Sequence, residues 1–247
     1  MTKISKICAI GDSSMLGEYL SNPNQESWLS ILGQRLNAEV VNDSANSASN
    51  YRNVFQLVKN LKENYDFYII QWGPYSRYTF YKSDTNYEVN FNIHLEYGRW
   101  SNEKIYKDWG TVLYKHWHNE LYAFKIFLQQ IILVQSILKE HNKQYCMIHG
   151  PEQHLSRWLA PRDEFISKTK DLINFDIMND KQILDEYEEI QYYSSLIDTS
   201  KFYKWNEFWV TQLPDVKLAS GSHPSKESHQ HLADLIYTHV QNQISNS

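Results

Sequence analysis

One short stretch near the N-terminus constrains the fold more than any other part of the sequence. An apolar run from Ile4 to Ile10 leads directly into Gly11-Asp12-Ser13-Ser14, which opens a segment that has the pattern of a helix. A short apolar run bounded by glycine is typical of a buried strand. A serine at such a strand-to-helix turn lies at the carboxyl edge of a sheet, where it is well placed to act as a nucleophile. The same residues also fit an ordinary turn followed by a serine N-cap.

The far end of the chain favours the nucleophile. The segment Ser220-Gly221-Ser222-His223-Pro224-Ser225 is typical of a loop, carries a histidine and opens a final amphipathic helix. In an open α/β fold, a serine after the first strand and a histidine before the last helix can meet at one sheet edge. We therefore predict that Ser13 and His223 are neighbours in space.

These two segments together resemble the SGNH, or GDSL-type, hydrolases. Gly11-Asp12-Ser13 matches the first block of that family, with Ser13 in the nucleophile position, and His223-Pro224-Ser225 matches the last block, with His223 in the base position. The resemblance implies a three-layer α/β/α, doubly wound and mostly parallel sheet of the flavodoxin-like kind. It also implies acyl transfer to water through a serine and a histidine.

The order of apolar segments agrees with this fold. Further strands are expected at Val40 and Val41, at Asp66 to Trp72 and at Gln144 to Ile148, with helices between them, so the sheet should have about four to five strands. We expect one domain over 1–247. A long aromatic-rich segment without strong periodicity, about 78–116, indicates an insertion that covers the active edge.

The middle blocks of the family match less well. The resemblance implies an oxyanion hole made by the backbone N–H of Ser13 and that of Ser47, where the family has a glycine. A serine keeps this donor if its backbone conformation allows a side chain. The family's third block places an asparagine donor where this chain has Tyr75, so the Tyr75 hydroxyl, Arg77 or Gln71 would have to supply a donor instead.

The orienting carboxylate is the largest departure. The family has an aspartate three residues before the histidine, and Ser220 stands at that position. Asp215 is the nearest carboxylate in sequence that could take its place. The alternatives are a Ser-His dyad, oriented by Ser220 or a backbone carbonyl, or a protein that has lost catalysis and kept the fold for binding.

Several further side chains follow the predicted strands and are expected to contact a substrate. Arg77 could bind a carboxylate or phosphate through its guanidinium, or be an ordinary loop arginine, and His149 is either a pocket residue or a structural histidine. The expected substrate-binding residues are Asp12, Ser14, Asn46, Asn50, Trp72, Tyr75, Arg77 and His149.

Composition narrows the function classes. The net charge is -5 and there is no basic tract, so binding to nucleic acid has no electrostatic support. Cys8 and Cys146 fit core residues rather than a disulfide framework. The apolar helix around 126–138 is expected to be too short and too polar to span a bilayer, and no signal peptide is visible, so we expect a cytoplasmic protein without membrane contact. No cofactor is expected, and His116, His118 and Glu120 are an unpromising metal site.

The resemblance thus implies a serine esterase that hydrolyses O-acyl esters, with O-acetyl groups on a glycan as one possibility. Aromatic residues, which stack on sugars as well as fill cores, form 15% of the chain; this fits a glycan, and a compositional bias of the genome toward tyrosine explains it equally well. The alternative is a catalytically impaired protein of the same fold that acts as a carbohydrate-binding or assembly module. A nucleotide-binding domain is disfavoured because no glycine-rich phosphate motif is present.

Overall fold

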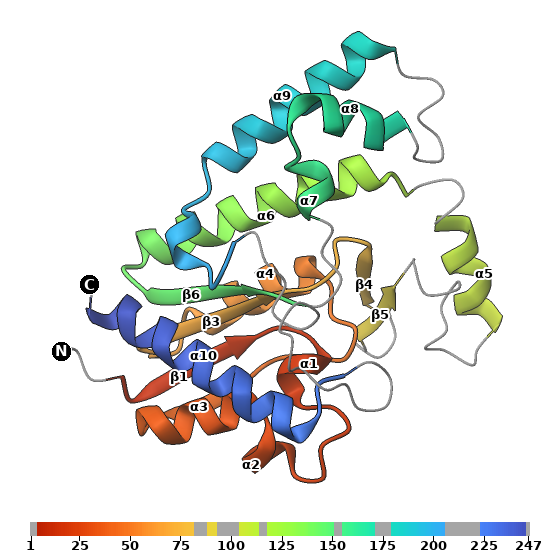
Figure 1. Ribbon diagram of the computed structural model, residues 1–247. Helices are drawn as coiled ribbons and strands as arrows, with labels where there is room; N and C mark the ends of the chain where they lie inside the picture. The colour runs from red at the N-terminus through yellow and green to blue at the C-terminus, as the bar shows by residue number, and fades with distance from the viewer. Residues whose placement is uncertain are drawn as a thin grey trace.

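The computed structural model describes residues 4–81, 88–92, 104–113, 118–150, 155–170, 179–205 and 223–245. Within these ranges the chain alternates strands and helices along most of its length (Figure 1). The strands are β1 (Lys6–Ile10), β2 (Glu39–Asn42), β3 (Phe67–Trp72), β4 (Arg77–Tyr81), β5 (Glu88–Asn92) and β6 (Gln144–His149). The longer helices are α3 (Trp28–Leu36), α4 (Asn50–Asn60), α5 (Lys104–Val112), α6 (Glu120–Glu140), α8 (Arg162–Lys170), α9 (Asp180–Ser195) and α10 (Lys226–Ser245). The short ones are α1 (Ser13–Leu16), α2 (Pro23–Glu26), α7 (Leu155–Trp158) and the 3-10 turn η2 (Thr199–Lys201).

A four-stranded parallel sheet forms the centre, in the order β2-β1-β3-β6. The two middle strands, β1 and β3, are rich in apolar residues because helices cover both of their faces. A single parallel bridge between Met147 and Phe202 continues the sheet beyond β6, where Tyr203 donates its N–H to the Met147 carbonyl. The expected α/β architecture with about four to five strands is confirmed, and the fifth is reduced to this bridge in the described residues.

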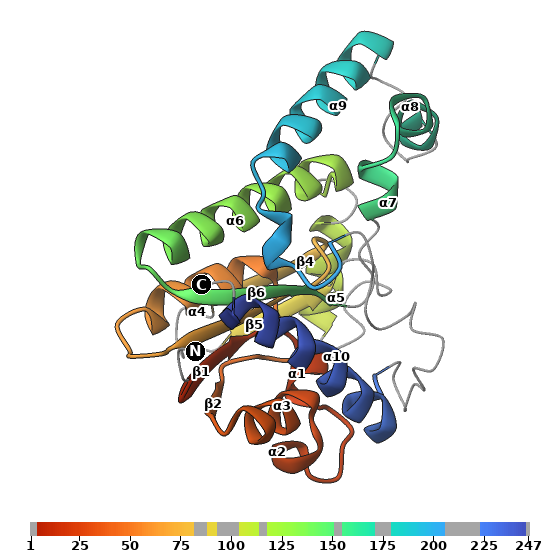
Figure 2. The ribbon, with the colours of Figure 1, turned by 60° about the vertical axis from the view of Figure 1, so that its left-hand side comes forward.

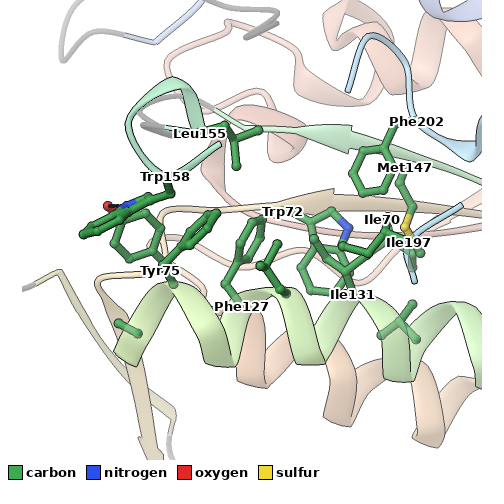
Figure 3. Packing of buried hydrophobic residues seen from close by; sticks show 14 of the residues in the cluster. Ile70, Trp72, Tyr75, Phe127, Ile131, Met147, Leu155, Trp158, Ile197 and Phe202 are labelled. Carbon is green, nitrogen blue, oxygen red and sulfur yellow. Dashed lines mark hydrogen bonds between the residues drawn. The ribbon is translucent and has the colours of Figure 1, made fainter. Parts of the chain in front are cut away.

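Helices lie on both faces of the sheet (Figures 1 and 2). One face packs against α3 and α10 through aliphatic side chains such as Ile7, Leu32 and Ile236. The other packs against α4 and α6 and is largely aromatic, as Figure 3 shows for Trp72, Phe127 and their neighbours. Because the two faces bury different sets of side chains, the sheet is the middle layer of three.

The two cysteines lie on opposite faces of this sheet. Cys8 belongs to the aromatic core and Cys146 to the aliphatic core, and both are free and buried. Burial raises the pKa of each thiol to about 12, so neither is a reactive thiolate near neutral pH. The prediction that they are core residues and not a disulfide is confirmed.

Helix α6 is the core helix of the aromatic face. Among the described residues it alone is long and apolar enough to cross a membrane by length and composition, so the expectation that it is too short and too polar is wrong. Half of its apolar stretch is buried inside the protein, where Phe124, Phe127 and Ile131 pack on the sheet. Its apolar character is thus explained by packing in the core.

The insertion contains more regular structure than the sequence pattern indicates. Strands β4 and β5 pair antiparallel as a separate two-stranded sheet, and α5 follows them. Thr79 on β4 is tied to the start of α4 by a 2.7 Å contact between its hydroxyl and that of Ser49. Both strands alternate polar and apolar residues, as in Glu88-Val89-Asn90-Phe91-Asn92, but each is only five residues long, so the sequence pattern did not separate them from the surrounding polar segment. Segments 82–87, 93–103 and 114–117 lie outside the described residues.

Candidate active site

Ser13 is the first residue of α1, directly beyond the carboxyl end of β1. Asp12 is the N-cap of this helix, and its carboxylate accepts hydrogen bonds from the Ser14 N–H at 3.0 Å and the Ser14 hydroxyl at 2.7 Å. Gly11 is required by close approach, because a Cβ there would lie 2.8 Å from the Gln71 side chain. These contacts fix the turn that presents the Ser13 hydroxyl.

His223 lies just before α10 and reaches the same turn. Its Nε2 is 2.9 Å from Ser13 Oγ, within hydrogen-bond distance, although the two residues are 210 positions apart. Helix α10 lies beside α1 and α3 in both ribbon views (Figures 1 and 2), and the Trp28 N–H at the start of α3 donates to His229 Nδ1. The predicted proximity of Ser13 and His223 is therefore observed. Ser13 is 7% exposed, so the pair is sheltered but open to small groups.

The residues expected to orient the imidazole cannot be placed. Asp215 and Ser220 both lie outside the described residues. A different carboxylate is observed at the histidine: Glu18 Oε2 lies 3.2 Å from His223 Nε2, the same nitrogen that faces Ser13. An orienting carboxylate of a serine-hydrolase triad contacts the other ring nitrogen, so Glu18 does not take that role.

Ser47 has a left-handed backbone conformation. Its φ is +55°, in the left-handed region where glycine is the usual residue. Among the described residues, neither the Ser47 N–H nor the Ser13 N–H donates one of the backbone hydrogen bonds found outside the helices and strands. The chain thus adopts at a serine a conformation that favours glycine, and the serine has the backbone N–H that the predicted oxyanion role would use.

Tyr75 does not supply the missing third donor. Its side chain is buried in the aromatic core, with its ring 5.7 Å from that of Phe124, and its hydroxyl accepts a 3.0 Å hydrogen bond from Trp158 Nε1. Figure 3 shows Tyr75 beside Trp158, at the end of a row that includes Phe127. The expectation that Tyr75 contacts a substrate is corrected: it is a core residue.

Arg77 is not a free anion-binding group. Its guanidinium makes a 2.6 Å ion pair with Asp12 Oδ2, and the two side chains are only 9% and 1% exposed. Gln71 donates to the other Asp12 oxygen and to the Ser14 hydroxyl. The expectation that Asp12, Ser14 and Arg77 bind substrate is therefore corrected, because the Asp12 carboxylate, the Ser14 hydroxyl and one terminal nitrogen of Arg77 are joined in a buried network.

Asn50 and Trp72 also have structural roles. The Asn50 side chain donates to the Gly73 carbonyl and accepts from the Gly73 N–H, each at 2.8 Å, which fastens the loop after β3 to the start of α4. Trp72 is fully buried, with its ring edge-on to Phe127 at 5.8 Å. Neither side chain is accessible to a substrate, which corrects both expectations.

His149 lies at the end of β6 but is buried in the core. Its ring stacks on Phe202 at 4.8 Å and lies 5.1 Å from the ring of Trp205. Burial lowers the pKa of His149 to about 3, so the ring is neutral near neutral pH. Of the two interpretations left open by the sequence, the buried structural histidine agrees with the structure and the pocket residue does not.

Asn46 is the one predicted substrate-binding residue that is exposed. Its side chain donates a 3.2 Å hydrogen bond to Glu18 Oε1, so it belongs to the rim of the Ser13 site. Glu18 itself is a site residue that the sequence reasoning did not select. It directly follows Gly17, the C-cap of α1, and this position gives no distinctive pattern, so only the fold places it beside His223.

No metal centre is found in the part of the chain that the structure describes, where no three His, Cys, Asp or Glu side chains gather. His118 instead shares a 3.2 Å hydrogen bond with the Tyr78 hydroxyl, and His116 lies outside the described residues.

No protein-family model matches the sequence, and no curated protein is similar to it in sequence. Among solved structures, the psychrotrophic esterase EstA from a Pseudoalteromonas species is 10% identical with a TM-score of 0.50, and the match covers 98% of this chain and 99% of that one.

Two further structures show the same likeness. A carbohydrate esterase family 2 enzyme with a carbohydrate-binding domain, from Corynascus thermopiles (Myceliophthora fergusii), is 12% identical with a TM-score of 0.50, over 98% of this chain and 67% of that one. A member of the lipolytic G-D-S-L family from Veillonella parvula is 13% identical with a TM-score of 0.45, over 95% and 97% of the two chains. At identities this low the likeness to the two esterases is one of fold, and the chain has the fold of the SGNH, or GDSL-type, hydrolases.

Proposed function

We propose that the protein is a serine esterase that hydrolyses O-acyl esters by acyl-enzyme chemistry at Ser13. The observation that carries this proposal is the 2.9 Å contact between Ser13 Oγ and His223 Nε2 at the carboxyl edge of the sheet. A nucleophile and a base within hydrogen-bond reach are the minimum machinery for this reaction. The fold shared with esterases is consistent with it.

The chemistry follows from the geometry. Ser13 Oγ attacks the ester carbonyl carbon while His223 Nε2 accepts the hydroxyl proton, and the carbonyl oxygen becomes an oxyanion near the N–H groups of Ser13 and Ser47. His223 then donates the proton to the leaving alcohol, and the C–O bond of the ester breaks. Water, deprotonated by the same nitrogen, hydrolyses the acyl-serine and regenerates the hydroxyl.

The test is hydrolysis of 4-nitrophenyl acetate by wild type, Ser13→Ala and His223→Ala. We expect each substitution to lower kcat at least about a thousandfold, since neither group works without the other. Ser21→Ala is the matched control, because Ser21 is an exposed serine outside the site, and it should keep wild-type turnover. A fluorophosphonate should label Ser13 in wild type and in Ser21→Ala only.

A non-catalytic role is the second candidate, and Tyr75 favours it. The position of the family's third oxyanion donor is filled by a side chain whose hydroxyl is bound to Trp158 in the core. A site with fewer oxyanion donors stabilises the transition state less, by about 10²- to 10³-fold for each donor. Absence of fluorophosphonate labelling, together with calorimetric binding of acetylated oligosaccharides that survives Ser13→Ala, would replace the esterase by a carbohydrate-binding module.

A further inference from the structure

We propose that Glu18 selects the substrate, favouring esters whose alcohol carries a hydrogen-bond donor next to the ester and rejecting negatively charged alcohols. This inference rests on the proposed function and adds the chemistry of the leaving group to it. It is carried by the position of the Glu18 carboxylate, which contacts His223, the base of the reacting pair, and Asn46, the residue before Ser47.

The backbone around Glu18 turns back onto the first residue of α1, Ser13. The N–H groups of Gly17 and Glu18 both turn back toward the Ser13 carbonyl, Glu18 at 3.3 Å. The residues on either side have positive φ, +75° at Gly17 and +69° at Tyr19. A tyrosine in the left-handed region is uncommon, and such conformations persist where the surrounding structure requires them. This turn therefore directs the Glu18 side chain toward the site rather than into solvent.

The two carboxylate oxygens of Glu18 have different neighbours. Oε1 accepts a 3.2 Å hydrogen bond from the side chain of Asn46, the residue before Ser47. Oε2 lies 3.2 Å from His223 Nε2. The side chain of Glu18 is 27% exposed, so it forms part of the surface that an incoming substrate meets.

The contact with Nε2 decides what this surface prefers. A histidine that is ready to accept the Ser13 proton has a lone pair, and no hydrogen, at Nε2. The Glu18 oxygen beside it is also an acceptor, so it receives no hydrogen bond from Nε2 in this state. A hydroxyl or ammonium group on the leaving alcohol would provide the missing donor. A carboxylate or phosphate on the leaving alcohol would bring a second negative charge close to the Glu18 carboxylate, which is unfavourable.

Tyr19 fits the same kind of leaving group. The residue is 52% exposed and its ring lies 5.0 Å from the ring of His223, so it forms an aromatic wall beside the carboxylate. An exposed aromatic ring next to a hydrogen-bond acceptor suits a polyol such as a sugar, whose C–H face packs on the ring while its hydroxyls donate. The shared requirement is a donor close to the ester oxygen.

Three acetyl esters with small alcohols separate the possibilities: ethyl acetate has no donor, 2-hydroxyethyl acetate has one, and acetoxyacetate carries a negative charge. Acetate release gives kcat/KM for each ester with wild type, Glu18→Gln, Glu18→Leu and Glu63→Gln. For each variant we take the ratio of kcat/KM between two esters. Comparing this ratio between variants removes the contribution of the esters' different intrinsic reactivities. Glu63 is an exposed acid in the loop before β3 and serves as the control for net charge.

We expect Glu18→Gln to lower the preference for 2-hydroxyethyl acetate over acetoxyacetate about tenfold, because the charge repulsion is lost. Glu18→Leu should also lower the preference for 2-hydroxyethyl acetate over ethyl acetate, by about two- to tenfold, because no acceptor remains. Glu63→Gln should leave both ratios unchanged. Ratios in Glu18→Gln equal to those of wild type would overturn the role of Glu18 while leaving the esterase intact. Absence of Ser13-dependent acetate release from all three esters would overturn the proposed function itself.

Discussion

The carboxyl edge of the sheet is built in two different ways over neighbouring strands. Beyond β1, polar groups from distant parts of the chain meet in a partly open site, where His223 contacts both Ser13 and Glu18. Beyond β3 and β6, the corresponding positions are closed by aromatic packing, with Tyr75 against Trp158 and His149 against Phe202. We call these the nucleophile side and the aromatic side.

The difference shows that one edge of the sheet can hold a reacting pair while the positions after the neighbouring strands are buried in the hydrophobic core. On the nucleophile side, polar atoms are left accessible and the chain tolerates positive φ at Tyr19 and Ser47. On the aromatic side, a hydroxyl and an imidazole that could have faced a substrate are buried instead. If this division is correct, substitutions on the aromatic side should change stability and not chemistry.

The largest effect is expected at the ion pair that lies between the two sides. Arg77→Met should lower the free energy of unfolding by about 3–5 kcal/mol, because it leaves the buried Asp12 carboxylate without its cation. Urea unfolding measures this value. Arg35→Met is the control, since Arg35 pairs with Asp234 at the surface, where an ion pair contributes about 1 kcal/mol or less. Equal losses in the two variants would show that the Asp12 network is not buried as described.

A pH-dependent effect of about 3 kcal/mol is expected from His149. Its pKa is lowered by burial from 6.5 to about 3, so below pH 6.5 the unfolded chain binds a proton that the folded chain does not. The contribution of the neutral ring to stability is therefore complete above pH 6.5. It falls as the pH falls, by about 1.4 kcal/mol per pH unit, and the loss reaches about 3 kcal/mol at about pH 4.

His149→Phe removes this proton uptake and keeps an aromatic ring of similar size among the same neighbours. The free energies of unfolding of wild type and His149→Phe should therefore differ by a constant amount above about pH 7 and diverge as the pH falls below about 6. His141→Gln, at an exposed histidine after α6, is the control for the loss of a histidine side chain at the surface. Parallel pH profiles for wild type and His149→Phe would mean that the ring is reached by solvent.

The sequence predicts the nucleophile side of the structure better than the aromatic side. The four strands of the central sheet, its flanking helices and the meeting of Ser13 with His223 follow from apolar periodicity and two short motifs, because the topology of parallel sheets brings strand ends to one edge. The roles of Tyr75 and His149 do not follow, since a polar aromatic residue after a strand has the same local pattern whether its ring faces a substrate or the core. Glu18 was missed for a related reason: its partner His223 is distant in sequence, and no local spacing marks it.

A smaller effect, on stability alone, is expected from the Tyr75 hydroxyl. Tyr75→Phe should lower the free energy of unfolding by about 1–2 kcal/mol, because the buried Trp158 N–H loses its acceptor. Turnover of 4-nitrophenyl acetate should stay within about twofold of wild type. Tyr68→Phe is the matched control, as its hydroxyl donates to the Asn60 carbonyl away from the site. A loss of about 10²-fold in kcat with Tyr75→Phe only would make that hydroxyl an oxyanion donor and remove the division between the two sides.

The smallest effect is expected at Ser47, where the nucleophile side uses a backbone group. Ser47→Gly relieves the cost of a side chain at φ +55° but gives the unfolded chain more freedom, and the two contributions, each about 0.5–1 kcal/mol, largely cancel. Because the proposed oxyanion donor is the backbone N–H, kcat should also stay within about twofold of wild type. Asn37→Gly, at φ +51° after α3, tests the same backbone change away from the site. Loss of turnover in Ser47→Gly but not in Asn37→Gly would assign the role to the Ser47 hydroxyl and would end the idea that this serine merely replaces a glycine.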